Sequence, residues 1–281
     1  MKPQRVVLVL SGGGMKAMAH IGVFRALQQA GITPSGIVAV SAGAMVGAMI
    51  AGGMPYERMV SIVTHLKQRD FATLNRASLI LRGVGAPSIL DPEPLRALLR
   101  RILPVSSFDA LRIPLRVAVT DMDRGTLEIF GAAGRTDAAL SDVVYASMAL
   151  PLYLPPAQLG GHTYGDGGLL QVLPLDLVIP GEADLVVASD VGPSGVAHPS
   201  WRTLAPRLIG LTDRSLSIVM ADQKARTIAA WRADRDRPPL LLVRPAVDPY
   251  GTFAFSKTVD FIEAGYRATH EALQHRTGEQ E

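Results

Sequence analysis

The sequence predicts an α/β protein with three layers, α/β/α, in which a mainly parallel central sheet is covered by helices on both faces. Two observations lead to this fold class. Short, apolar, β-branched runs recur along the whole chain, and stretches with helical periodicity separate them. Strands that alternate with helices in this way form parallel sheets with a helical layer on each face.

The first 70 residues predict two strand–helix units and a third helix. Residues 6–10 form an apolar run that ends at three glycines, as a buried strand before a tight turn does. The helix expected at 15–30 has apolar residues at helical spacing and a glycine directly after it. The strand at 37–40 precedes an almost wholly apolar helix at 42–50, which we expect to be buried on most faces. A helix at 55–67 begins with proline.

The remaining elements continue the alternation after a long excursion at 71–90, where periodicity is weak. The expected strands lie at 115–120, 126–130, 185–188 and 240–243, and the expected helices begin near 92 and cover 137–148, 203–233 and 259–275. The first two of these strands are joined through Asp121, Asp123 and Gly125. The stretch GGHTYGDGG is rich in turn residues, and a break is expected in the long helical region near Gly210.

Composition excludes several classes of function. With 281 residues, 48% hydrophobic and 19% charged, the chain is long enough for a sizeable core and has the composition of a globular protein. Its formal net charge of +3 is too even to indicate a nucleic-acid partner. The chain has no cysteine, which excludes disulfides, thiolate metal sites and cysteine nucleophiles.

The hydrophobic runs are short. The run Val6 to Leu10 near the N-terminus is too short for a signal peptide, and no stretch approaches the ~20 apolar residues that cross a bilayer. We therefore expect a cytoplasmic protein whose contact with membranes is peripheral where it occurs.

A glycine loop, SGGGMK, follows the first strand. Such a loop presents backbone N–H groups at a helix N-terminus, where a negative oxygen is stabilised. Three interpretations are open: a dinucleotide-binding loop, a tight turn that needs glycine for its geometry, and an oxyanion hole. Gly12, Gly14 and Ala17 fit the dinucleotide pattern, but no acidic residue ends the second strand. A P-loop is excluded because no Gly-Lys-Ser/Thr closes the loop.

Ser41 follows the second strand at a strand-to-helix corner. A nucleophilic serine on such a sharp turn needs small residues two positions before it and two positions after it. Ala39 and Gly43 meet this requirement. Serine is also a favoured N-cap, so this motif alone leaves both interpretations open.

Asp166 lies between glycines in the stretch GDGG, a pattern that by itself is typical of a hairpin turn. Combined with Ser41 and the glycine loop, it completes a hydrolytic set of nucleophile, carboxylate and N–H donors. A Ser-Asp-His triad stays open through His198, which follows Asp166 in the chain. However, an α/β-hydrolase has several strands before its nucleophile, and only two precede Ser41.

Four blocks together resemble the patatin-like phospholipases: SGGGMKAMAHIGV, VSAGAMVGA, ASMALPLYLPP and GDGGLLQVLP. The resemblance runs from about residue 6 to 178 and implies a patatin-like core with a Ser–Asp dyad, without histidine, metal or cofactor. By matching position, Ser41 is the expected nucleophile and Asp166 its partner. The expected oxyanion hole consists of the backbone N–H groups of Gly12, Gly13 and Gly14.

The neighbouring motif positions are occupied by Lys16, Ala17, Ala39, Gly43, Gly167 and Gly168. The family usually has glycine where Ala17 and Ala39 stand, and often asparagine where Val172 stands. We expect Ala39 to give a tighter elbow that still functions. His20 and Asp190 are expected to be structural, and Lys16 to be a solvated helix residue rather than a phosphate ligand.

Residues 5–178 are expected to form the catalytic core, residues 179–276 to complete the same domain, and residues 277–281 to be a tail. The resemblance implies a lipid acyl hydrolase of the phospholipase A or lysophospholipase type, acting on a lipid or ester substrate. Alternatives are a carboxylesterase for short-chain esters and a catalytically silent lipid-binding module, with a nucleotide-binding protein more distant. An ordinary aspartate pKa of about 3.9 predicts that activity falls below about pH 5, with no loss centred near the histidine pKa.

Two further features bear on the substrate. Five methionines lie in or beside the motifs and either fill a core or line an acyl pocket: Met15, Met18, Met45, Met49 and Met148. Residues 71–90 are either a lid that contacts membranes or an ordinary surface loop.

Overall fold

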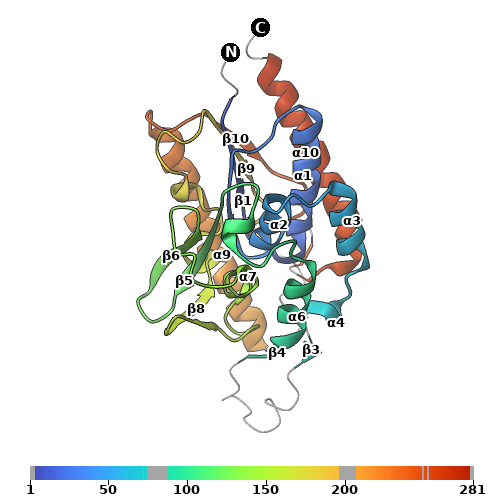
Figure 1. The fold of residues 1–281 in the computed structure, drawn as a ribbon, viewed down its shortest axis with the longest axis vertical. Helices are drawn as coiled ribbons and strands as arrows, with labels where there is room; N and C mark the ends of the chain where they lie inside the picture. Colours follow the sequence, from blue (N-terminus) through green and yellow to red (C-terminus); the bar gives the residue numbers. More distant parts are fainter. Residues whose placement is uncertain are drawn as a thin grey trace.

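The computed structural model describes residues 4–71, 73–74, 88–195, 207–248, 250–251 and 253–278. Its centre is an eight-stranded mixed sheet with the strand order β10-β9-β1-β2-β5-β8-β7, and β6 pairs with β5 off this path (Figure 1). The strands are β1 (Val6–Leu10), β2 (Gly36–Val40), β5 (Leu115–Asp121), β6 (Thr126–Gly131), β7 (Ala157–Leu159), β8 (His162–Asp166), β9 (Leu185–Ser189) and β10 (Leu240–Val243).

The strands from β10 to β5 are parallel, whereas β6 and β8 run antiparallel to β5, and β7 antiparallel to β8. In this register Leu10 lies opposite both Ala39 and Ser189, so β1, β2 and β9 end together at one edge of the sheet. Ser11 and Ser41, the next residues after β1 and β2, are therefore neighbours in space. The expected mainly parallel α/β fold is confirmed.

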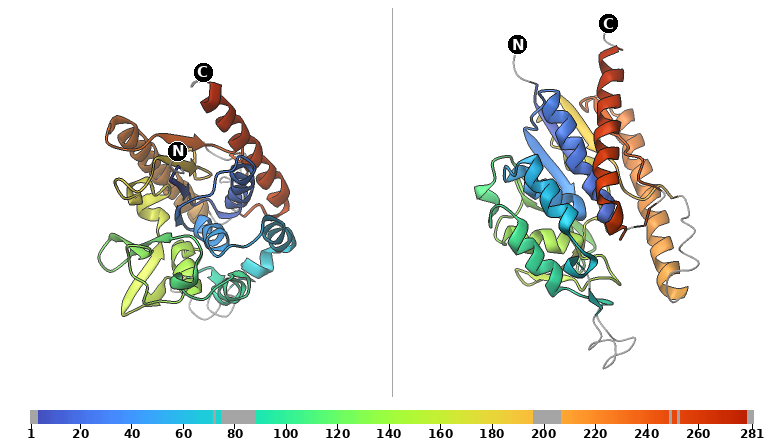
Figure 2. Two further views of the ribbon diagram at one scale, coloured as in Figure 1. Left: turned by 45° about the horizontal axis from the view of Figure 1, so that its top comes forward. Right: turned by 90° about the vertical axis from the view of Figure 1, so that its right-hand side faces the viewer.

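Helices cover both faces of the sheet, as Figure 2 shows in two further views. Residues of one face share a hydrophobic core with residues of α1 (Ala19–Gln29), α2 (Ala42–Ala51), α3 (Tyr56–His65), α6 (Glu93–Ile102), α7 (Leu140–Met148) and α10 (Thr258–Gly278). The other face packs against the segment that follows β8 and against α9 (Arg207–Ala233). Side chains of β1 alternate between these two cores: Leu8 joins the first, and Val7 and Val9 join the second. This alternation follows from the two-residue period of a strand.

Several short elements complete the fold. These are the 3-10 turns η1 (Gly14–Met18), η3 (Phe108–Ala110), η4 (Leu175–Leu177) and η6 (Phe255–Lys257), the one-turn helices α4 (Gln68–Phe71) and α8 (Gly168–Gln171), and the strands β3 (Thr73–Leu74) and β4 (Leu90–Asp91), which pair with each other. Most of the excursion expected at 71–90 lies outside the described residues, and so does most of the segment for which a role as a lid is considered.

The structure differs from the expected elements in several places, and it adds β7, which is not among the expected strands. The helix expected from residue 15 begins as the 3-10 turn η1. The stretch GGHTYGDGG turns at Gly160 and Gly161 and again at Gly167, and β8 occupies the five residues between these turns. The break expected at Gly210 is absent, because α9 continues through this residue. The last helix extends to Gly278, two residues into the expected tail.

Among the helices that the structure describes, none is long and apolar enough to span a membrane.

Candidate active site

Ser41 lies at a sharp elbow between β2 and α2. Its backbone has φ 55° and ψ −135°, in a region that residues other than glycine seldom adopt. Its side chain makes no capping hydrogen bond to α2. The N-cap interpretation therefore explains neither the backbone conformation of Ser41 nor the direction of its hydroxyl.

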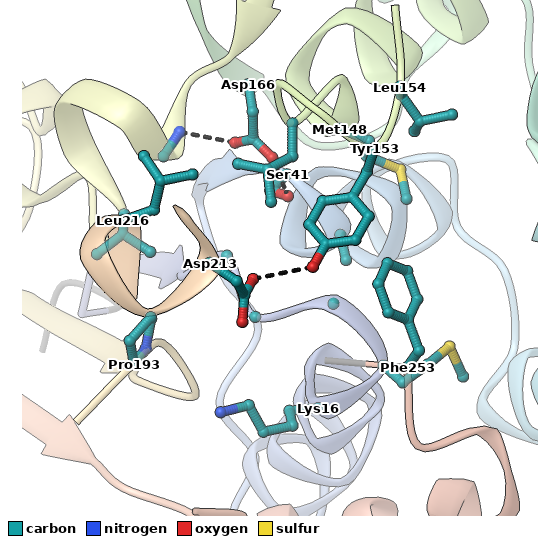
Figure 3. Close-up of a pocket in the computed structure, with 18 of the residues that line it drawn as sticks. Lys16, Ser41, Met148, Tyr153, Leu154, Asp166, Pro193, Asp213, Leu216 and Phe253 are labelled. Atoms are coloured by element: carbon teal, nitrogen blue, oxygen red, sulfur yellow. Dashed lines mark hydrogen bonds between the residues drawn. The ribbon is translucent and has the colours of Figure 1, made fainter. Parts of the chain in front are cut away.

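The Ser41 hydroxyl instead donates a hydrogen bond to Asp166, with 2.7 Å between Oγ and Oδ2 (Figure 3). The other carboxylate oxygen, Oδ1, accepts the N–H of Gly168 at 2.7 Å. Asp166 ends β8 and is 4% exposed. The fold thus brings together two side chains that are 125 positions apart in the chain, as the sequence predicts for a dyad.

The glycines beside Asp166 permit close packing rather than a hairpin turn. A Cβ on Gly167 would lie 2.3 Å from the carbonyl oxygen of Ala118 in β5, which is too close for any side chain. Gly167 itself has helical angles and leads into α8. The hairpin-turn interpretation of this motif is therefore wrong, and its glycines let Asp166 approach the sheet.

Burial changes the acidity of Asp166. Desolvation raises the pKa of this carboxyl to about 7, although the hydrogen bonds from Ser41 and from the Gly168 N–H act in the opposite direction. This raised pKa differs from the ordinary aspartate value on which the expected loss of activity below about pH 5 rests. A carboxylate with a pKa near 7 is a much better match for general-base chemistry at neutral pH.

The glycine loop runs beside the elbow. A Cβ on Gly12 would lie 3.1 Å from the Ser41 Cβ, so this loop contacts the nucleophile candidate. The Gly12 N–H donates to the Val172 carbonyl at 2.9 Å and is therefore not free to bind an oxyanion. No described residue accepts a hydrogen bond from the N–H of Gly13 or Gly14, and both glycines line the cavity at Ser41. The expected three-donor hole is thereby reduced to two candidate donors.

Ala39 and Gly43 support the elbow in different ways. A Cβ on Gly43 would lie 2.4 Å from the Ser11 carbonyl oxygen, so glycine is required there. Ala39 is fully buried, and its methyl group faces Gly47 of α2, where an added Cβ would be only 3.1 Å away. Gly47 thus provides the space that the Ala39 methyl group occupies. Ala17 is buried in η1.

The cavity in front of Ser41 is mainly apolar and measures about 130 Å³. Its apolar wall includes Phe71, Leu95, Met148, Leu154, Phe253 and Phe255. Three of the five methionines considered above line it, namely Met15, Met18 and Met148, whereas Met45 and Met49 are fully buried in the core.

One wall of this cavity was not expected from the sequence. Helix α9 contributes Asp213, Leu216 and Met220, none of which lies in a recognisable motif. Asp213 accepts a hydrogen bond from the Tyr153 hydroxyl at 3.2 Å, and the two side chains meet near Ser41 in Figure 3. Burial raises the pKa of Tyr153, and Asp213 reinforces this shift.

Lys16 is 8% exposed and lines the same cavity, so the expectation of a solvated helix residue is wrong. Burial lowers the pKa of its ammonium group, and the nearby carboxylate of Asp248 opposes this shift most strongly. The ammonium group forms no ion pair with the described residues. Lys16 is therefore a buried, partly desolvated residue of the cavity wall.

The histidines offer no third member of a triad among the described residues that line the cavity. His20 is fully buried behind the glycine loop, where its ring nitrogens lie 2.8 Å from the Ser189 hydroxyl and 2.9 Å from the Ser11 carbonyl oxygen. Burial lowers its pKa to about 4. His198 lies outside the described residues.

One group of potential metal ligands forms away from this cavity, although no such cluster was expected from the sequence. Asp121, Asp123 and His162 bring ligand atoms within 4.8 Å of one another at the turn after β5. The carboxylate of Asp121 already accepts the N–H groups of Asp123 and Arg124, and it lies 3.4 Å from the Arg124 guanidinium. The Asp121 carboxylate therefore stabilises its own turn, and this role accounts for its position in the group.

Known proteins resemble this chain in sequence and in fold. A family model described as patatin-like phospholipase matches residues 8–179. An uncharacterized NTE family protein of Mycobacterium tuberculosis is 32% identical over 201 residues, which make up 70% of this chain and 53% of that protein. Patatin-like phospholipase domain-containing protein 6 of Homo sapiens is 27% identical over 282 residues, covering 93% of this chain and 20% of that protein.

The crystal structure of VipD from Legionella pneumophila has a similar fold, with a TM-score of 0.54 and 17% sequence identity. The alignment covers 97% of this chain and 67% of the VipD chain. This likeness concerns the fold. The chain spans about half the length of the mycobacterial relative and a fifth of the human one.

Proposed function

The chain belongs to the patatin-like phospholipase family, a family of carboxylic ester hydrolases, and on this premise we propose that it hydrolyses lipid esters with Ser41 as nucleophile and Asp166 as general base. The observation that carries the proposal is the hydrogen bond from Ser41 Oγ to Asp166 Oδ2 at the floor of an apolar cavity.

In the proposed reaction, Ser41 attacks the ester carbonyl while its proton moves to Asp166. The N–H groups of Gly13 and Gly14 stabilise the oxyanion of the tetrahedral intermediate. Asp166 then gives the proton to the leaving alcohol, which departs from the acyl-enzyme. Water attacks the acyl-enzyme in a second cycle, with the same carboxylate as base.

The cavity favours a lipid over a short ester. Aromatic and aliphatic side chains form most of its wall, and burying an acyl chain there gains about 0.8 kcal/mol for each methylene group. Lys16 lies on the wall of this cavity, where its ammonium group can bind the phosphate of a phospholipid. These features of the cavity wall support a phospholipid or lysophospholipid as the proposed substrate class.

The test combines active-site labelling with hydrolysis. Wild type should react with a fluorophosphonate and hydrolyse p-nitrophenyl esters, with rates that rise from the C4 to the C12 acyl chain, as well as phospholipid micelles. Ser41→Ala should abolish labelling and lower kcat at least about a thousandfold, because the nucleophile is lost. Ser61→Ala is the matched control and should be fully active, because Ser61 is an exposed residue of α3.

The outcomes separate the alternatives. A wild type that neither reacts with the fluorophosphonate nor hydrolyses any ester would contradict the proposal and favour a lipid-binding module. Activity that is greatest with C4 esters would indicate the short-chain carboxylesterase instead. Residual activity in Ser41→Ala equal to that of wild type would exclude Ser41 as nucleophile.

A further inference from the structure

Ser147 is a buried serine in the ASMALP block that none of the steps above uses. It lies at the C-terminal end of α7 and is 0% exposed. Its hydroxyl oxygen accepts a hydrogen bond from the Ser41 N–H at 2.7 Å. The same hydroxyl donates to the carbonyl oxygen of Ala118 in β5, also at 2.7 Å.

One of these two hydrogen bonds holds Ser41, whose backbone is strained. The φ of 55° at Ser41 is unfavourable for a residue with a side chain and persists only where the surroundings hold it. Ser147 contacts the backbone nitrogen of that same residue. The rigid β5 strand, through Ala118, fixes the direction of the Ser147 hydroxyl.

The end of α7 also contacts the other member of the dyad. The Asp166 N–H donates to the Ala149 carbonyl at 3.0 Å, just two residues beyond Ser147. From β5, the Thr120 hydroxyl donates to the Asp166 carbonyl oxygen at 2.9 Å. The backbones of Ser41 and Asp166 are therefore both held by hydrogen bonds to the end of α7, while β5 bonds to Ser147 through Ala118 and to Asp166 through Thr120.

We propose that Ser147 is a positioning residue, which holds the backbone of Ser41 so that the Ser41 hydroxyl stays within hydrogen-bond distance of Asp166. This inference rests on the proposed function, because it assigns a role in the chemistry of the dyad. A serine near a helix end commonly bonds a carbonyl one turn earlier in its own helix. Ser147 instead links two other elements, and one of them carries the nucleophile.

The test compares three variants. Ser147→Ala removes both hydrogen bonds, and Ser147→Cys replaces the hydroxyl by a somewhat larger thiol that forms much weaker ones. Thr269→Val is the matched control, because Thr269 is also 0% exposed and donates its hydroxyl to Gly265 within α10. The readouts are kcat and KM for one p-nitrophenyl ester, the rate constant for fluorophosphonate labelling, and Tm.

Ser147→Ala should lower kcat and the labelling rate about ten- to a hundredfold, because small misplacements of reacting groups have effects of this size. KM should change less than about threefold, since Ser147 does not line the cavity. The kcat and labelling rate of Ser147→Cys should lie between those of wild type and those of Ser147→Ala. Thr269→Val should retain the wild-type kcat even where its Tm falls.

Two results would overturn the inference: a folded Ser147→Ala with the kcat and labelling rate of wild type, or a loss of kcat in Thr269→Val as large as in Ser147→Ala. If Ser147→Ala does not fold, Ser147→Cys decides, and a wild-type kcat in that variant rejects the role. A wild type that fails to react with the fluorophosphonate contradicts the proposed function instead.

Discussion

Asp166 is the residue in which burial and chemistry are most closely linked. The site that excludes water from the carboxyl group also raises its pKa to about 7, because the ionised form loses solvation. Among the described residues, the Ser41 hydroxyl and the Gly168 N–H alone compensate through hydrogen bonds. The protein thus keeps a base that is reactive at neutral pH and is costly to ionise.

The pH dependence of activity follows directly. Because the ionised form of Asp166 accepts the proton of Ser41, kcat/KM should rise with pH and reach half its maximum near pH 7, and the measurement is a pH profile on a neutral ester. A midpoint near 7 alone does not identify aspartate, since histidine titrates in the same range. An unchanged pH profile in His198→Ala supports the dyad. If kcat/KM of that variant no longer rises through about pH 7, the result supports a triad.

Asp166→Asn should make the fold more stable while abolishing activity. The native pKa lies above the ordinary value of 3.8, so ionisation of Asp166 destabilises the fold progressively as pH rises from about 4 to about 7. Asparagine removes this charge and should raise stability on the order of a few kcal/mol at pH 8, with the difference disappearing toward pH 4. Urea unfolding at both pH values measures it. An equal or lower stability of the variant at pH 8 would contradict a raised pKa.

At the scale of elements, the elbow depends on how closely α2 approaches β2. The methyl group of Ala39 occupies space that exists because residue 47 is glycine. This complementarity explains why a residue larger than the usual glycine is accommodated beside the nucleophile without displacing the helix.

Gly47→Ala should therefore destabilise the protein, although alanine is the better helix former by up to about 1 kcal/mol. The new methyl group would lie 3.1 Å from the Ala39 Cβ, which is fixed on a central strand. The double variant Ala39→Gly/Gly47→Ala should recover stability and labelling of Ser41. A thermal-unfolding double-mutant cycle checks this, and purely additive effects would show that the two residues do not compete for space.

The regular elements were predictable where the local pattern and the tertiary structure agree. The apolar runs of β1, β2, β5, β9 and β10 and the helix after Ser41 are all present. The prediction failed at β8, where glycine-rich sequence suggested a turn but pairing with β5 produced a strand. It failed again at Gly210, which is buried within α9, because packing outweighs the low helix propensity of one glycine.

At the scale of the whole molecule, the sheet assembles the site from distant segments. The carboxyl ends of β1 and β2 present the glycine loop and Ser41, and β8 enters from the antiparallel side with Asp166. Each motif alone left its role open, and the resemblance of four sequence blocks to one family made these residues predictable from the sequence. The roles of Gly12 and Lys16, and the cavity wall from α9, depend on contacts between segments far apart in the chain, which no local pattern records.

The origin of the cavity wall has an evolutionary consequence. The residues proposed for bond breaking all fall within 8–179, whereas α9 and the phenylalanines near residue 255 come from the later part of the chain. Mutation in that later part can remodel substrate preference while the reacting atoms stay where they are. Substitutions in α9 or at Phe253 and Phe255 should therefore change which acyl chains are accepted without moving Ser41 or Asp166.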